Sequence, residues 1–301
     1  MGGVVKRKRA VKRKKYAERP FPDKSVKDLR RASLVVINKP KGPFSFHVTD
    51  EVKRILRVKK TGHAGTLDPN ATGTLPIGVN KGCHVLQAIS HAPKEYEGVM
   101  HLHSEVPLNK IIKASKKFIG KITQLPPVRS AVKREERERE IYSLEIEDVH
   151  KRNVYFTVSC QAGTYIRKLC TDWGDEMGTK AHLKDLKRTK AGPYTLKEAV
   201  KFEVFKRNPE SYLLPVESAI THLKRVWLDD KTIESLIHGS QPFLPGVYKY
   251  ERGFKQGELI ALMTPAQELA ALATALMSSD ELKGDKGQVA KLERVVIQKP
   301  L

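Results

Sequence analysis

The chain has 301 residues, of which 40% are hydrophobic, so it is long enough and apolar enough for two domains with separate cores. Lys and Arg number 56 against 34 Asp and Glu, which gives a formal net charge of +22 at pH 7. Three scattered cysteines argue against a disulfide framework or a zinc site, and the most apolar stretch, residues 269–277, is too short to span a bilayer. We therefore expect a soluble intracellular protein with no secretory signal, no membrane association and a polyanionic partner.

The chain begins with a strongly basic segment. Residues 1–19 contain nine Lys or Arg and one Glu, a net charge of +8 that leaves +14 for the rest of the chain. This segment has almost nothing apolar to bury, so residues 1–25 are predicted to be a disordered tail until they meet phosphate. Because the remainder is also basic, a nucleic-acid partner is favoured, although charge alone does not separate RNA, DNA and anionic membrane.

Strand and helix patterns alternate through residues 26–222, which predicts an α+β domain. A buried strand is expected at 34–37, followed by the turn-forming sequence KPKGP. Apolar residues at helical spacing predict a helix that ends near residue 56, with Ser45 as its N-cap. Residues 96–102 have the alternation of a strand with one buried face, and 108–119 have the helical period, closed by a glycine.

The clearest unit is a strand, a tight turn and a helix within residues 154–173. Apolar residues alternate strictly with polar ones up to Cys160, and the sequence Gln-Ala-Gly then breaks the chain. Ile166, Leu169, Cys170 and Trp173 follow at the spacing of one helix face. This unit predicts a helix whose first turn lies beside the end of a strand.

The last part of the chain, residues 223–301, has the pattern of a small, mostly β domain. Short strands are expected at 226–228, 258–262 and 295–297, separated by Gly/Pro turns. One short helix is expected at 232–238, stopped by the glycine that follows.

Residues 62–76 form a loop that presents one carboxylate. Gly62, Gly65 and Gly73 allow backbone angles that other residues avoid, and Pro69 favours an extended conformation for Asp68. An apolar strand is expected directly behind the loop, at residues 75–79. A carboxylate held on a shaped loop is a candidate catalytic group, although local physics alone favours a simple turn.

The sequence GHAGTLDPNATG at 62–73 resembles the signature loop of the TruB/dyskerin family of pseudouridine synthases, without a break. Further segments are similar to family elements and occur in the family order: KPKG at 39–42, KEY at 94–96, PPVRSAVKR at 126–134, GTYIR at 163–167 and LKRTKAG at 186–192. Residues 223–301 resemble a PUA domain more weakly. The resemblance implies a catalytic domain with a mixed, mainly antiparallel sheet flanked by helices, plus the small PUA-like domain.

The resemblance also implies roles for individual residues. Asp68 would be the catalytic aspartate, Tyr96 would stack on the target uracil, and Arg167 would pair with Asp68 and contact the target nucleotide. His63 and Leu186 would also contact the substrate. Because burial opposes ionisation of a carboxylate, an arginine partner would keep a buried Asp68 charged. The basic residues expected at substrate phosphates are Arg129, Lys133 and Arg134.

The isomerisation of uridine to pseudouridine breaks the N1–C1′ bond, turns the uracil and joins C5 to C1′. It involves no net redox change or hydrolysis, so we expect neither a metal nor another cofactor. The target nucleotide must leave its stack, which costs free energy, and stacking of the flipped base on an aromatic side chain compensates for part of it. Asp68 would attack the sugar or remove its 2′ proton; the sequence does not choose between these routes.

The PPVRSAVKR segment and the PUA-like part resemble the archaeal and eukaryotic dyskerin side of the family. That side implies an H/ACA ribonucleoprotein in which guide RNA and small companion proteins assist modification of rRNA or tRNA, in the cytoplasm of a prokaryote or the nucleolus of a eukaryote. The alternatives are a stand-alone enzyme of the tRNA T-loop and a non-catalytic scaffold for guide RNA. A DNA-binding protein is disfavoured because no helix-turn-helix, finger or zipper pattern occurs.

Two further segments bear on these interpretations. His101 and His103 are opposite in phase to Tyr96 on their strand, so we interpret them as a surface pair rather than metal ligands. The sequence Phe44-Ser-Phe-His47 departs from the Thr-Ser-His order that is usual in the family, so an altered entry to the following helix is expected.

Overall fold

A computed structural model describes residues 4–6, 21–22, 24–125, 133 and 135–297. The helices are α1 Val26–Arg31, α2 Ser45–Leu56, α3 Leu86–His91, α4 Leu108–Ser115, α5 Ile166–Glu176, α6 Phe202–Arg207 and α7 Asp230–Ile237. The strands of the larger sheet are β2 Ala32–Lys39, β3 Thr61–His63, β4 Ala71–Asn80, β5 Lys94–Leu102, β6 Gly120–Gln124, β7 Arg137–His150, β8 Asn153–Cys160, β9 Ala181–Ala191, β10 Tyr194–Thr195, β11 Val200–Lys201 and β12 Leu214–Pro215. Those of the smaller sheet are β1 Val4–Lys6, β13 Arg225–Leu228, β14 Val247–Glu251, β15 Leu259–Met263, β16 Leu269–Ala275 and β17 Ala290–Val295.

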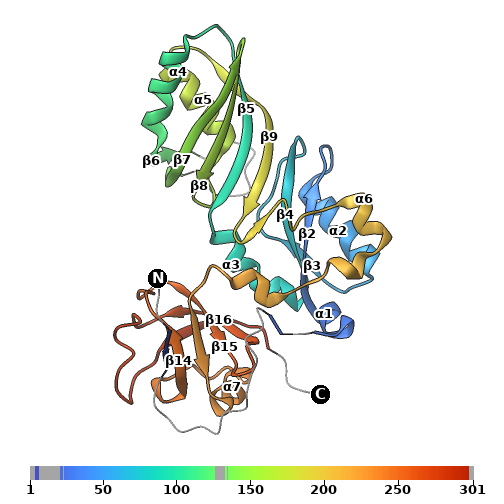
Figure 1. Cartoon of the computed structure of the whole chain (residues 1–301), viewed down its shortest axis with the longest axis vertical. Coiled ribbons are helices and arrows are strands. Elements are labelled where there is room, and N and C mark those ends of the chain that lie inside the picture. The colour runs from blue at the N-terminus through green and yellow to red at the C-terminus, as the bar shows by residue number, and fades with distance from the viewer. Residues whose placement is uncertain (1–3, 7–20, 23, 126–132, 134, 298–301) are drawn as a thin grey trace.

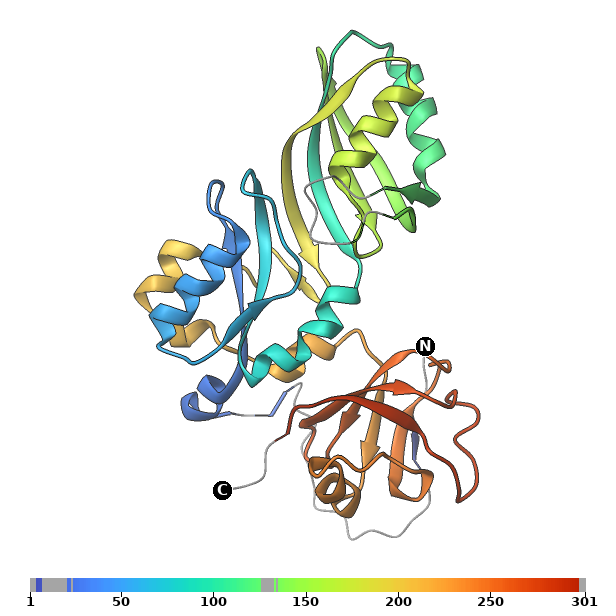
Figure 2. The same ribbon diagram turned by 180° about the vertical axis from the view of Figure 1, so that it is seen from behind.

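The larger sheet has eleven strands, with the main order β11-β2-β4-β9-β5-β8-β7-β6. Neighbouring strands are mostly antiparallel, but β4 and β9 run parallel and join the two halves of the sheet. Helices α4 and α5 pack on the half that contains β5, β8 and β7, and α2 and α6 pack beside β2 and β4 (Figures 1 and 2). This arrangement confirms the predicted α+β class, with a mixed and mainly antiparallel sheet.

The predicted strand–turn–helix unit is present as β8 and α5, and the amphipathic stripe of α5 is buried as its spacing requires. Leu169, Cys170 and Trp173 are inaccessible to solvent, and the Trp173 ring packs edge-on against Phe156 of β8. The predicted strands at 34–37, 75–79 and 96–102 are the cores of β2, β4 and β5. The sequence pattern was sufficient at these places because most side chains on at least one face of each element are buried.

Two details of the predicted helices are wrong. Ser45 is the first residue of α2 rather than its cap; Phe44 takes the cap position without a side-chain hydrogen bond. The helix expected at 108–119 ends at Ser115 and continues as a short 3₁₀ turn at Lys116–Phe118. The Ser115 hydroxyl donates to the Ile112 carbonyl, a local bond that competes with helical hydrogen bonding.

The interpretation of residues 1–25 as a disordered tail is also wrong in part. Val4–Lys6 form β1, which pairs antiparallel with β14 at the edge of the smaller sheet. Ser25 caps α1 through its hydroxyl, which accepts from the Asp28 N–H. The edge of a sheet offers unpaired backbone groups, and this short segment supplies partners for them.

The smaller sheet carries the C-terminal part of the chain. Its strands follow the order β1-β14-β13-β15-β16-β17. The helix expected at 232–238 is α7, which starts two residues earlier, after an Asp229 cap, and ends before Gly239 as predicted. The strand expected at 295–297 lies earlier, as β17 at Ala290–Val295. The apolar run near residue 270 is β16, an inner strand whose side chains are buried on both faces.

A shared hydrophobic core joins the two sheets. Leu34 and Ile89 of the first part pack in one buried cluster with Trp227, Met263 and Leu272 of the second. Polar contacts add to this joint, since the Leu269 N–H donates to the buried Glu217 carboxylate at 3.0 Å. The two parts of the molecule therefore form a continuous packed body.

Candidate active site

The loop between β3 and β4 is held at four alternate residues. The carbonyl of Gly65 accepts from the Arg188 guanidinium at 3.0 Å. The Ser45 hydroxyl contacts both the N–H and the carbonyl of Leu67, at 2.8 and 2.9 Å. The carbonyls of Pro69 and Ala71 accept from the ammonium of Lys39, at 3.2 and 2.8 Å. Asp68 lies between these anchored residues, and its side chain is about half exposed.

Lys39 is an interior cation in this anchorage. Its side chain is completely buried, and its ammonium contacts three carbonyls, the third being that of Pro40 at 2.9 Å. Burial lowers the pKa of Lys39, and the negative charge of Asp68 acts in the opposite direction. The charge is thus used to hold backbone oxygens beside Asp68.

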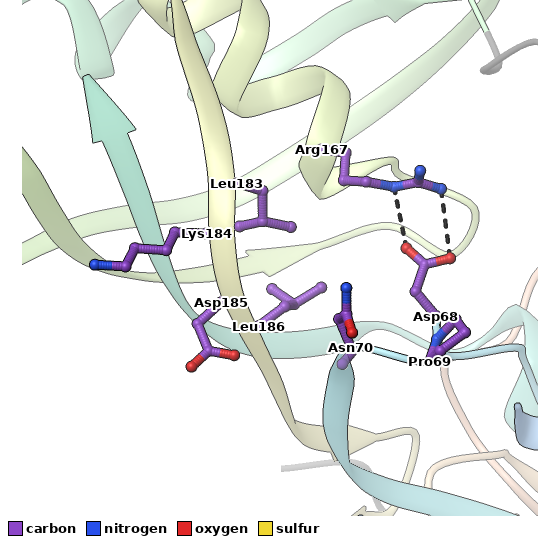
Figure 3. Close-up of a pocket in the computed structure, with 9 residues that line it drawn as sticks. Asp68, Pro69, Asn70, Arg167, Leu183, Lys184, Asp185 and Leu186 are labelled. Carbon is purple, nitrogen blue, oxygen red and sulfur yellow. Dashed lines mark hydrogen bonds and ion pairs between the residues drawn. The ribbon is translucent and has the colours of Figure 1, made fainter. Parts of the chain in front are cut away.

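Asp68 forms an ion pair with Arg167. The Arg167 Nε lies 3.0 Å from one carboxylate oxygen of Asp68, and Nη2 donates to the other at 3.4 Å (Figure 3). The two residues are 99 positions apart in the sequence. Both side chains are about half exposed, 54% for Arg167 and 46% for Asp68, and an exposed pair contributes little to stability. Its importance is therefore positional: it fixes the direction of the carboxylate.

This exposure corrects the expectation that Asp68 is buried. In the free protein the carboxylate reaches water. The Arg167 guanidinium therefore orients the group, and it is accessible itself.

Arg167 lies in the first turn of α5, and that turn is fixed from β6. The buried side-chain amide of Gln124 accepts from the Tyr165 N–H at 2.9 Å and donates to the Tyr165 carbonyl at 3.2 Å. Tyr165 is the N-cap residue of the helix. Gln124 thus sets where the helix begins, and it belongs to no motif that the sequence offered.

An open pocket of about 250 Å³ adjoins the ion pair. It is lined by the Asp68 loop, by Arg167 and by β9 (Figure 3), with the residues Asp68, Pro69, Asn70, Ala71, Arg167, Leu183, Lys184, Asp185 and Leu186. Ligand pockets usually have about 300–1,000 Å³, so this one lies just below that range and suits a single base rather than a larger group. The parallel pairing of β4 with β9 brings the loop and this wall together.

Tyr96 stands on β5 directly across from Arg188 of β9. It is partly buried and packs against the core beneath α5. Burial raises the pKa of Tyr96, and its hydrogen bond with Arg188 acts in the opposite direction. Tyr96 does not line the pocket, but its hydroxyl is close enough to Asp68 to feel the negative charge.

Arg188, like Lys39, is a buried cation that sequence reasoning did not identify. It is 1% exposed, and besides the Gly65 carbonyl it donates through Nε to the carbonyl of Thr74 at 2.8 Å. It therefore connects β9, β4 and the loop. Its place in the LKRTKAG segment was the available signal, as the KPKG segment was for Lys39.

The other predicted residues have different fates. Leu186 lines the pocket. His63 lies in β3 behind the loop, near the hydroxyls of Thr49 and Thr66, and burial together with the Arg188 charge lowers its pKa. Lys133 is exposed and pairs with Glu135. Arg129 and Arg134 lie outside the described residues, and their assignment to substrate phosphates stays a prediction.

Three histidines gather on the outer surface at the end of β5. His103 lies 3.0 Å from His182, and His101 contacts Asn153 instead. The described residues contain no group of three or more His, Cys, Asp or Glu placed to hold a metal ion. His103 is exposed and His101 partly exposed, as expected for residues on the outer face of the strand. No described helix is long and apolar enough to cross a membrane.

Comparison with known proteins covers nearly all of the chain. Residues 53–166 match the N-terminal domain of the TruB family of pseudouridylate synthases, 167–221 the C-terminal domain of tRNA pseudouridylate synthase B, and 224–296 the PUA domain. A protein of Pyrococcus horikoshii named probable tRNA pseudouridine synthase B is 42% identical over 276 residues, which cover 87% of this chain and 83% of that protein. One of the same name from Methanocaldococcus jannaschii is 37% identical over 297 residues, covering 94% and 88%.

Solved structures agree with this. The chain is similar to one in a Cbf5-Nop10-Gar1 complex, with a TM-score of 0.90, 35% identity and coverage of 99% of this chain and 94% of that one. It is also similar to a chain of an H/ACA RNP bound to a substrate RNA containing 2′-deoxyuridine, with a TM-score of 0.88, 32% identity and coverage of 99% and 96%. On the match of sequence, fold and signature loop together, the chain belongs to the TruB family of pseudouridine synthases and carries a C-terminal PUA domain.

Proposed function

We propose that this pseudouridine synthase is the catalytic subunit of an H/ACA guide ribonucleoprotein, with Asp68 as its catalytic residue. The observation that carries the chemical part is the carboxylate of Asp68, oriented by Arg167 at the mouth of a pocket of single-base size. Support for the guided assembly comes from the similarity over 99% of the chain to the proteins in complexes described as Cbf5-Nop10-Gar1 and H/ACA RNP. The prokaryotic relatives favour the cytoplasm.

Each group then has a task in the isomerisation. The target uridine leaves its stack and enters the pocket, where Leu186 supplies an apolar wall and Arg167 contacts the nucleotide. Asp68 attacks the sugar or removes its 2′ proton, and the N1–C1′ bond breaks. The uracil turns near Tyr96 and its C5 bonds to C1′, while the sugar leaves Asp68 or regains its 2′ proton. The hydrogen at C5 is then lost as a proton and N1 gains one, so the product is an isomer of uridine. Closure by RNA removes water from the half-exposed carboxylate, which strengthens its interaction with the developing charge.

The test of the catalytic assignment is Asp68→Asn, which keeps the shape of the side chain and removes its charge. We expect RNA binding to persist and pseudouridine formation to fall by at least about 10²-fold. Arg167→Lys should be nearly as damaging, because lysine lacks the planar fork. Asp175→Asn is a matched control, since Asp175 is another exposed carboxylate of α5 and pairs with Lys180 away from the pocket. Substantial turnover by Asp68→Asn would remove Asp68 from the mechanism.

A stand-alone tRNA enzyme is the second candidate, because the curated relatives are named tRNA pseudouridine synthase. The purified protein is therefore assayed on unmodified tRNA alone, and on a target strand with guide RNA and the companion proteins, with pseudouridine mapped in both. Product only in the guided reaction supports the proposal; full activity on bare tRNA favours the alternative. Guide binding without product in any reaction would indicate a scaffold.

A further inference from the structure

The segment that leads from β2 into α2 borders the pocket. The Gly42 N–H donates to the Pro69 carbonyl at 2.9 Å, and the Lys41 ammonium lies 3.5 Å from the Asp185 carboxylate. Pro69 and Asp185 both line the pocket. A strand of RNA that delivers one nucleotide to Asp68 therefore has to pass close to this segment.

Two phenylalanines of this segment are turned to solvent. The exposed fraction is 52% for Phe44 and 60% for Phe46, and among the described residues Phe243 is the one other exposed phenylalanine. Their ring centroids are 6.5 Å apart, and the His47 ring lies 4.0 Å from that of Phe46. Neither phenylalanine belongs to a hydrophobic core of the molecule.

The outward direction follows from how α2 is anchored. The hydroxyl of Ser45 is tied to the backbone of Leu67, and Val48 and Val52 face the core. With Ser45 and the apolar stripe turned inward, the residues on either side of Ser45, Phe44 and Phe46, are left exposed to solvent. The rings are thus held two and four residues after Gly42, on a segment that Ser45 ties to the Asp68 loop.

The chemistry of this surface suits nucleobases. Taking one uridine out of the stack leaves its neighbours without a stacking partner, and exposed aromatic rings beside a cation supply one. Lys41 carries a positive charge three residues before Phe44, within a chain of net charge +22. A folded protein partner on the same rings would cover the margin of the pocket, where RNA has to enter.

We propose that Phe44 and Phe46 form a stacking platform for the nucleotides that flank the target uridine. The platform would position the substrate. It would be particular to this chain, because Phe44 and Phe46 stand where a Thr-Ser-His order is usual in the family. It depends on the proposed function, because it presupposes that RNA enters at Asp68.

The test uses the assembled particle with guide RNA and a synthetic target strand that carries 2-aminopurine on one or the other side of the target uridine. Stacking on a ring quenches the fluorescence of this base. For the double variant Phe44→Ala/Phe46→Ala we expect the Kd of the target strand to rise by about 5- to 150-fold, the equivalent of one stacked base. The quenching should be lost, and the single-turnover rate at saturating RNA should stay within about threefold of wild type.

Conservative variants separate stacking from other roles. Phe46→Trp should keep tight binding and quenching, whereas Phe46→Leu, which keeps apolar area without an aromatic face, should lose them. Phe243→Ala removes an equally exposed ring of the C-terminal domain and should leave both quantities unchanged. Wild-type binding by the double variant would overturn the inference, and a Phe46→Leu variant equal to wild type would assign the surface to a protein contact. An inactive wild type would instead refute the proposed function.

Discussion

Lys39 offers a direct test of how the Asp68 loop is held. Lys39→Met keeps the length of the buried side chain and removes the ammonium that contacts three carbonyls. Leaving one buried acceptor without its donor costs about 1–3 kcal/mol. Part of the total loss of stability is offset, because the variant no longer has to bury a charged ammonium, whose desolvation lowers the pKa of Lys39. We expect the free energy of unfolding to fall by about 2–4 kcal/mol.

The assay is urea unfolding of the variant, with Lys41→Met as the control. Lys41 is two residues away and exposed, and its pair with Asp185 is worth about 0–1 kcal/mol at most. In the fraction that stays folded, the carbonyls on the C-terminal side of Asp68 lose their anchor. A shift of about 1 Å in Asp68 would lower the single-turnover rate by about 10²-fold without a matching loss of RNA affinity. A Lys39→Met protein as stable and as fast as wild type would refute the anchoring role.

Three other predictions concern the surroundings of the site. Gly73→Ala should destabilise the protein by more than about 2 kcal/mol and abolish activity, because Gly73 has a φ of +105° and an added Cβ would lie 2.2 Å from the Arg188 carbonyl oxygen. The control is Gly120→Ala, also at positive φ but in open space, which should cost about 1–2 kcal/mol in the same urea titration. Equal losses of stability in the two variants would contradict the clash. Arg188→Lys keeps the charge but not the fork that joins two carbonyls, so single-turnover kinetics should slow by about 10²-fold, and an unchanged rate would count against that role. Burial lowers the pKa of Lys94 from 10.5 to about 8, so between these pH values the unfolded chain binds more protons at Lys94 than the folded chain does. The free energy of unfolding of wild type, relative to that of Lys94→Met, should therefore increase by up to about 3 kcal/mol as the pH rises from 8 to 10.5. A difference that does not change with pH would contradict the lowered pKa.

The parts of the fold that could be predicted are those in which one face of an element is buried. The stripe of α5 and the alternation of β8 follow directly from that requirement. The start of β7 could not be found this way, because its first four residues, Arg137 to Glu140, are all charged. They become a strand by pairing with β6, a long-range contact that leaves no local periodicity.

The candidate site shows the same division. Glycines and a proline indicated a shaped loop around Asp68, but it was the resemblance of the whole 62–73 segment to a family signature that singled out this carboxylate. Lys39 and Arg188 were not predicted, because a buried cation has the same letter as a surface one, and only the fold shows which carbonyls surround it. Gln124 lies 41 residues from the helix start that it fixes, so its contribution is legible only in three dimensions.

The hydrophobic core shared by the two sheets holds the two domains at a fixed distance from each other. Trp227 and Leu272 are locked against Leu34, so the distance from the PUA surface to the Asp68 carboxylate is set by packed side chains rather than by a flexible tether. An RNA bound both at the PUA surface and at Asp68 would have to match that fixed distance. Selection among RNA molecules would then depend on the length of the duplex between the two binding sites as well as on its sequence.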